Sequence, residues 1–371
     1  MGMYAKQALS GLCATAVLLI SFPSVFADQI KSVYTMSNQI AGNEVLVFHR
    51  QLNGNLEAAG AFATGGNGTG GGLGNQSAIV LDPSDRWLFV VNAGSGSISS
   101  FRVLEDGLQF VDTAPSGGFQ PLSLTVFGTW LYVLNAGNPN DVNENDNITG
   151  FQINQNGTLA PIPNSTQPLS ADETGPAQIS FNKEGTVLLV TEKDANSITT
   201  YTVDADGIPS SPISRASAIP TPFGFQFGDR DLVYISEANG GGPSAVVSYH
   251  VNPETGVVSN AVDVFNAQNA ACWVALFNDQ TVGYTTNTGS HSISIFTINF
   301  DGSMESLLAN ERAVRAGAGP IDLVVTQDGR NLYVLNAADD TIGAFRVHSD
   351  GRLNRLRTVN TPDGANGLAA R

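Results

Sequence analysis

Cysteine is almost absent from the sequence, which contains only Cys13 and Cys272. Because Cys13 lies in an N-terminal segment that we expect to be removed, the mature chain would hold one thiol and no intrachain disulfide. Paired-cysteine zinc patterns, a His-Glu-x-x-His motif and a serine nucleophile elbow are also missing. We therefore expect neither a metal nor a cofactor.

Positive charge is also scarce, with 17 Lys and Arg against 33 Asp and Glu and a formal net charge of −16. Loss of Lys6 with the leader would make the charge −17. Nucleic-acid binding depends on Lys and Arg displacing the counterions of the phosphate backbone. The composition therefore argues against a nucleic-acid partner, and the acidity itself indicates solubility more than chemistry.

Long hydrophobic runs are missing beyond the N-terminus. Residues 1–27 carry Lys6, an apolar run from Ala14 to Phe22, and the ending Val25-Phe26-Ala27 that a signal peptidase accepts. The run is short for a membrane span. We expect a signal peptide at 1–27, no integral membrane segment in the mature chain, export to the periplasm or medium, and a monomer.

Helical periodicity of useful length is missing as well, and a short turn motif recurs in its place. Successive copies are 53, 50, 50, 49, 46 and 49 residues apart. Asx-Gly pairs favour tight hairpins because glycine adopts positive φ without penalty. The seven copies are Asn53-Gly54, Asp106-Gly107, Asn156-Gly157, Asp206-Gly207, Thr255-Gly256, Asp301-Gly302 and Asp350-Gly351.

Three kinds of strand precede each turn. An alternating run such as Ser97–Phe101 lies directly upstream and predicts a half-buried third strand. A more apolar run such as Leu88–Val91 comes before it and predicts a second strand covered on both faces. In six repeats a first strand begins near these residues: Ser77, Pro121, Pro176, Phe223, Cys272 and Pro320.

Four strands in each of seven repeats of about 50 residues predict an all-β, seven-bladed β-propeller formed by residues 28–371 as a single domain. The first repeat lacks its leading strand, and the C-terminal segment Ala365–Ala370 has the right repeat position to supply it. Such closure would pair the edges of the first and last blades. An open β-solenoid is the alternative, but it does not explain the displaced strand.

One face of such a propeller, which we call the mouth face, carries the loops into the first strands and the loops between second and third strands. Each second strand ends there in Asn or Glu. Glu192 and Glu237 are our candidate catalytic residues, because a carboxylate at a position otherwise held by Asn can act as an acid, base or ligand. The equivalent amides are candidate ligand-binding residues, with strand capping as the alternative: Asn92, Asn135, Asn287 and Asn336.

Other candidates lie at the entries into the first strands. Gln120, Gln178, Phe223 and Trp273 would line the same mouth, either to bind a ligand or to pack the channel. Their neighbour Cys272 lacks a local base or cation to activate it, so we expect an inert buried thiol.

Histidine offers one further candidate. Of the mature histidines only His291 falls in a mouth loop, and it is our remaining ligand-binding candidate.

Two unusual segments carry weaker signals. Asp141, Asn143 and Asn145 have the alternating spacing of a calcium loop, but Asp146 and Gln152 replace its Gly and bidentate Glu, so we expect a solvated loop. The glycines of 65–74 predict a flexible loop between the first two blades. No helix pattern follows them, which argues against a dinucleotide site.

The blade sequences resemble the lactonase family of seven-bladed propellers, the 6-phosphogluconolactonase and carboxymuconate lactonizing enzyme type. The resemblance rests on phrases such as Asp82-Pro-Ser-Asp-Arg-Trp-Leu-Phe-Val-Val-Asn92, Gly175-Pro-Ala-Gln178 and Asp328-Gly-Arg-Asn-Leu-Tyr-Val-Leu-Asn336. It implies lactone hydrolysis and places Glu192 at the family's Glu after the second strand. The family's Gly-Pro-Arg-His phrase reads Gly175-Pro-Ala-Gln178 here, and a neighbouring His phrase reads Gln120-Pro-Leu-Ser123, which argues against a phosphorylated sugar lactone.

Three functions remain open from the sequence. The first is a lactonase-like hydrolase acting on a small-molecule lactone at the central mouth, with Glu192 or Glu237 as base. The second is a non-catalytic propeller that binds a small ligand or a protein at its mouth. The third is a surface scaffold. A shared fold does not choose between them.

Overall fold

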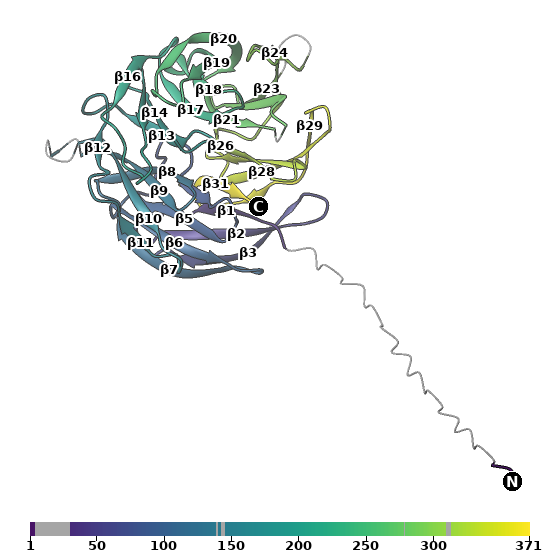
Figure 1. Cartoon of the computed structure of the whole chain (residues 1–371). Coiled ribbons are helices and arrows are strands. Elements are labelled where there is room, and N and C mark those ends of the chain that lie inside the picture. Colours follow the sequence, from purple (N-terminus) through teal and green to yellow (C-terminus); the bar gives the residue numbers. More distant parts are fainter. Residues whose placement is uncertain (4–29, 139, 142–144, 278, 309–312) are drawn as a thin grey trace.

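The structure is a computed structural model that describes residues 1–3, 30–138, 140–141, 145–277, 279–308 and 313–371. Seven antiparallel blades surround a central axis (Figure 1). In blades 3, 6 and 7 the outermost strand consists of two short pieces. The seven-bladed all-β prediction is therefore confirmed, and one 3₁₀ turn, η1 (Asn239–Gly241), is the only helical element among the described residues.

The innermost strands contact one another around the axis. In blade order they are β31 (Asn366–Ala370), β4 (Ile79–Leu81), β8 (Gln120–Phe127), β13 (Pro176–Phe181), β17 (Pro222–Phe227), β21 (Ala271–Leu276) and β26 (Pro320–Val325).

The second strands are buried along nearly their whole length because the neighbouring blades cover both of their faces. Their continuous apolar sequences agree with this position. In blade order they are β1 (Ser32–Met36), β5 (Trp87–Asn92), β9 (Trp130–Ala136), β14 (Val187–Glu192), β18 (Leu232–Glu237), β22 (Val282–Asn287) and β27 (Asn331–Asn336).

The third and outer strands complete each blade, and the outer strands of blades 1 and 2 are mostly exposed or half-buried, as expected at a solvated edge. The third strands are β2 (Glu44–Arg50), β6 (Ser97–Val103), β10 (Asn147–Ile153), β15 (Ser197–Thr202), β19 (Pro243–Val251), β23 (Ser292–Ile298) and β28 (Thr341–Val347). The outer strands are β3 (Leu56–Ala63), β7 (Leu108–Pro115), β11 (Leu159–Pro161), β12 (Gln167–Pro168), β16 (Ile213–Ala216), β20 (Val258–Asn269), β24 (Met304–Ser306), β25 (Val314–Arg315), β29 (Leu353–Arg355) and β30 (Val359–Asn360).

The C-terminal strand closes the ring as the sequence predicts. β31 pairs antiparallel with β1, with Val33 opposite Ala370 and Met36 opposite Asn366. On its other side, the Leu368 N–H donates to Asp322 Oδ2 of blade 7 at 3.1 Å. The first blade is thus built from both ends of the chain, and no edge is left open at the junction.

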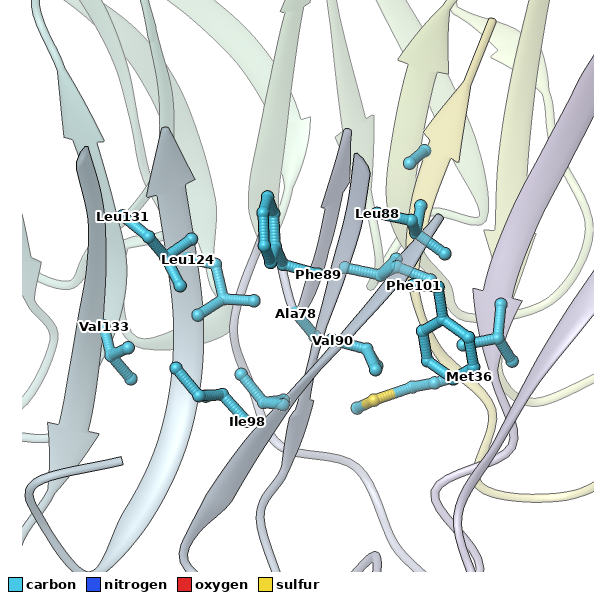
Figure 2. Packing of buried hydrophobic residues seen from close by; sticks show 14 of the residues in the cluster. Met36, Ala78, Leu88, Phe89, Val90, Ile98, Phe101, Leu124, Leu131 and Val133 are labelled. Carbon is cyan, nitrogen blue, oxygen red and sulfur yellow. The ribbon is translucent and has the colours of Figure 1, made fainter. Parts of the chain in front are cut away.

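Apolar side chains fill the space between blades. Figure 2 shows this packing for blades 1 to 3, where Met36, Phe89, Phe101 and Leu124 belong to one buried cluster. Complete burial of a Leu, Met or Phe side chain contributes about 1.5–3 kcal/mol. The interfaces between blades are therefore the hydrophobic core of the molecule.

The Asx-Gly turns also connect neighbouring blades. Tyr132 Oη donates to the carbonyl of Gly207 in the next blade, and Tyr284 Oη donates to Gly351 in the same way. Gly207 and Gly351 have φ angles of 78° and 83°. A Cβ on Gly207 would lie 2.8 Å from the Trp130 ring of the preceding blade. Glycine is required there both for the turn and for the close approach.

The expected signal peptide lies almost entirely outside the described residues. Within the part of the chain that the structure describes, none of the helical structure is long and apolar enough for a membrane span.

Candidate functional site

The glycine-rich segment 64–76, which we call the strap, crosses the mouth face at the axis. Asn75 Nδ2 donates to the Leu122 carbonyl of blade 3, and the Gln76 N–H donates to the Ala177 carbonyl of blade 4 at 3.1 Å. Gln76 Nε2 reaches the Val274 carbonyl of blade 6 at 3.2 Å. The expected flexible loop between the first two blades thus makes specific contacts with three other blades.

Glycines let the strap approach other backbone segments closely. A Cβ on Gly68 would lie 2.1 Å from the backbone of Asn38. Below the strap, a Cβ on Gly224 would lie 2.2 Å from Gln76 Oε1. The abundance of glycine in and under the strap therefore has a packing cause.

Lys193 and two aromatic rings lie beneath the strap. Lys193 Nζ donates to the carbonyls of Gly74 and Pro176 at 2.9 and 2.8 Å, and it lies 5.1 Å from the Phe223 ring centroid. The Phe223 and Trp273 rings meet edge to face at 5.1 Å. Burial lowers the pKa of the Lys193 ammonium to about 8. These contacts fix the strap to blades 4, 5 and 6.

Three predicted site residues, Phe223, Trp273 and Gln178, are engaged in this arrangement. Trp273 Nε1 donates to the Asn75 carbonyl at 2.7 Å. Gln178 is buried, and its amide exchanges two hydrogen bonds with the backbone of Phe225. Their neighbour Cys272 is buried, and burial raises the pKa of its thiol to about 11, in line with the expected inert thiol.

Below the strap, a polar cavity of about 360 Å³ follows the axis. Gln76 and Gln178 lie at its mouth end, and Gln226 of β17 and Gln327, in the turn after β26, line it farther along the axis. It also contains Asp322, whose pKa burial raises to about 8.

The two predicted catalytic residues are fully buried within their blades. Glu192 accepts hydrogen bonds from the Ser170 N–H at 3.4 Å and from the Ser170 hydroxyl. Glu237 accepts from the Ile219 N–H and from Tyr249 Oη, each at 2.5 Å. Burial raises the pKa of both carboxyl groups, that of Glu237 to about 7.

The predicted asparagines occupy the equivalent buried positions. Asn287 Oδ1 accepts from the Gln268 N–H at 3.3 Å, and Asn336 Oδ1 accepts from the Gly317 N–H at 3.1 Å. Asn92 Nδ2 donates to Ser99 Oγ at 2.8 Å, and Asn135 Nδ2 donates to the Ser116 carbonyl at 3.3 Å. In five blades the side chain that ends the second strand thus holds the segment that enters the same blade, which is a positioning role.

The remaining predicted site residues lie apart from one another. Gln120 is half-buried at the start of β8, where it pairs with Ala136. His291 is exposed in the loop before β23, where it lines a separate pocket between blades 6 and 7. The eleven candidates therefore share the mouth face without converging on one cavity.

A cavity of about 610 Å³ opens on the mouth face between blades 3 and 4. Residues 136–138, 141 and 145–146 line one side, and residues of the entry loop 172–176 line the other. Its lining includes five carboxylates and, among the described residues, neither Lys nor Arg. The carboxylates are Asp141, Asp146, Asp172, Glu173 and Asp194.

Asp146 holds the two walls of this cavity together. It is buried and accepts hydrogen bonds from the Gly137 N–H at 2.5 Å and from the Thr174 N–H and Oγ1 at 2.7 and 2.6 Å. Asp194 lies against Gly175, where a Cβ would come within 2.3 Å of Asp194 Oδ2. Asp146 is therefore a positioning residue, whereas Asp194 presents an exposed carboxylate to the cavity.

Two residues of the calcium-like run, Asp141 and Asn145, line this cavity. Of the calcium-like run Asp141, Asn143 and Asn145, Asn143 lies outside the described residues. No group of three or more His, Cys, Asp or Glu side chains suited to a metal ion occurs in the described ranges.

Lys193, Asp172 and Asp194 were not predicted as site residues. Lys193 and Asp194 directly follow Glu192 in the same mouth loop, so their position was readable from the repeat phase. The sequence did not show the path of the strap, nor that residues 136–138, 141 and 145–146 line one side of the cavity.

Comparison of the sequence with known proteins shows which family the chain belongs to. Residues 24–167, 142–275 and 273–369 match the family model described as Lactonase, 7-bladed beta-propeller. Because these matches span nearly the whole sequence, the chain belongs to this lactonase family of seven-bladed propellers. The resemblance stated from the blade phrases is thus confirmed.

Individual relatives are distant. The 6-phosphogluconolactonase of Yersinia pestis (strain Pestoides F) is 23% identical over 295 residues, which cover 76% of this chain and 79% of the relative. Among solved structures, the periplasmic gluconolactonase of Pseudomonas aeruginosa has a TM-score of 0.74 at 16% identity, covering 92% of this chain and 99% of that one. A protein from Lactobacillus plantarum has the same TM-score at 14% identity, with 92% and 99% coverage. At such identities the structural likeness establishes the fold alone.

Proposed function

We propose that this protein hydrolyses an uncharged lactone in the acidic cavity between blades 3 and 4. The observation that carries the proposal is the carboxylate lining of that cavity, in a chain that matches the lactonase family over nearly its whole length. Ester hydrolysis near neutral pH needs a base to activate water. Exposed carboxylates in a cavity of substrate size supply one.

Asp194 is the carboxylate to which we assign the role of general base. Its carboxylate faces the cavity beside Gly175, at the edge of the loop that also carries Glu192 and Lys193. In the proposed reaction Asp194 takes a proton from water, the water oxygen attacks the lactone carbonyl, and the ring C–O bond breaks as its oxygen is protonated. The product is the open hydroxy acid.

The charge of the cavity favours a neutral substrate. Five carboxylates, with neither Lys nor Arg among the described lining residues, would repel a phosphate group. The leader-like N-terminus supports the same choice, because phosphorylated sugar lactones are cytosolic metabolites. We accordingly propose that the protein acts outside the cytoplasm.

A set of isosteric variants tests the assignment. Asp194→Asn should lower kcat on a neutral lactone by about 10²- to 10⁴-fold, the usual contribution of a general base, with an unchanged melting temperature. Glu192→Gln should retain turnover within a few-fold. The matched control is Asp231→Asn, an exposed aspartate remote from the cavity with φ of 59°, which Asn tolerates.

Three outcomes would contradict the proposal in different ways. Full activity of the Asp194→Asn variant would show that Asp194 is not the general base. Loss of activity in the Glu192→Gln variant alone would show that Glu192, the candidate predicted from the sequence, is the general base. Absence of turnover by the wild-type protein across a panel of lactones favours the binding or scaffold alternatives.

A further inference from the structure

We propose that the pocket between blades 6 and 7 on the mouth face is an anion-binding site, specific for a small carboxylate or phosphate group. The pocket has a volume of about 300 Å³. His291, Arg315 and Arg355 contribute side chains to it, and Asp339 is the one carboxylate in its described lining. This site is separate from the acidic cavity and does not depend on the proposed hydrolysis.

The two arginines carry unused donors. Arg315 lies on β25 and Arg355 on β29, so the outer strands of two neighbouring blades bring them to one pocket. Among the residues that the structure describes, neither guanidinium has a recorded hydrogen bond or ion pair. A guanidinium offers N–H donors in a planar fork that matches the oxygen atoms of carboxylate and phosphate groups.

His291 supplies a third donor with a defined tautomer. Its Nδ1 accepts a hydrogen bond from the Gly319 N–H at 3.0 Å, so Nδ1 carries no proton. The proton of the neutral ring is therefore on Nε2, which becomes a donor. His291 has a positive φ of 53°, a backbone conformation that is uncommon outside glycine.

The charge balance of the pocket is opposite to that of the rest of the molecule. Asp339 is already engaged, since its Oδ2 accepts the Ala318 N–H at 2.6 Å. Two guanidiniums then face one occupied carboxylate, in a chain whose formal net charge is −16. Anions avoid most of such a surface, so a local positive pocket is a selective feature rather than part of a general basic patch.

The shape of the pocket is also suited to a small group. Ala316 and Gly317 are buried in its floor and present mostly backbone. A Cβ on Gly317 would lie 2.5 Å from the Asn336 side chain, so the floor stays free of larger side chains. The pocket volume of about 300 Å³ is thus available to a small ligand.

The test is calorimetric titration of the full chain with inorganic phosphate and, separately, with acetate, using chloride to hold ionic strength constant. Wild-type protein should bind at least one of the two probes saturably at a single site. The Arg315→Gln/Arg355→Gln variant should bind at least tenfold more weakly. Arg352→Gln is the matched control, because Arg352 is an exposed arginine of blade 7 that pairs with Asp350 at 3.3 Å, and it should bind as the wild type does.

Two results would overturn the site: no saturable binding of either probe to the wild-type protein, or unchanged affinity in the double variant. Tighter binding of phosphate than of acetate identifies a phosphate site, and the reverse identifies a carboxylate site. Since binding is measured without turnover, these results are independent of whether the protein hydrolyses lactones.

Discussion

Asp322 places a carboxyl group inside the axial cavity, where the protein surrounds it almost completely. Its two oxygens accept the N–H groups of Leu323 and Leu368, at 2.8 and 3.1 Å. These bonds offset burial only in part, and its pKa is raised to about 8 from an ordinary value of 3.8. The fold therefore favours the protonated form of Asp322.

This gives a prediction at the scale of one residue. The stability that protonated Asp322 contributes is complete below pH 3.8 and is lost as the pH rises through 8, because the folded protein must then hold a buried charge. Asp322→Asn cannot ionise, so its melting temperature should rise relative to that of the wild type between pH 4 and pH 8. Parallel melting curves across this range would contradict the assignment.

The strap makes short polar contacts with three other blades, and Gln76 joins two of them, blade 4 through Ala177 and blade 6 through Val274. Gln76→Ala should therefore release the strap while leaving the blades intact. We expect faster amide exchange across residues 64–76 by mass spectrometry, with unchanged exchange in the second strands. Gln155→Ala, at an exposed hairpin position, is the control. Unchanged exchange in the strap would show that Gln76 does not anchor it.

Sequence periodicity predicted the strands and turns more completely than the arrangement of the candidate functional site. The turn glycines and apolar runs locate strands because their causes are local: positive φ in a hairpin and burial on both faces. The strap was missed because its contacts with Leu122, Ala177 and Val274 join segments far apart in sequence. Their positions in the repeats correctly placed Glu192 and Glu237 at strand ends. Only the three-dimensional structure shows that their carboxylate oxygens accept hydrogen bonds from loop amides.

At the scale of the whole molecule, closure by β31 was predictable because one repeat lacked a strand that the C-terminus could supply. The distribution of charge over the mouth face was not predictable. It depends on which loops become neighbours, and it places an acidic cavity between blades 3 and 4 and a basic pocket between blades 6 and 7. The net charge of the chain alone predicts neither the acidic cavity nor the basic pocket.

The most direct measurement of the central claim compares initial rates on a neutral aldonolactone and on its phosphorylated counterpart in a pH-stat. Carboxylates that line the cavity should make kcat/KM for the neutral lactone about tenfold or more higher at low ionic strength, and added salt should narrow the gap as it screens the repulsion. A higher kcat/KM for the phosphorylated lactone would contradict the account.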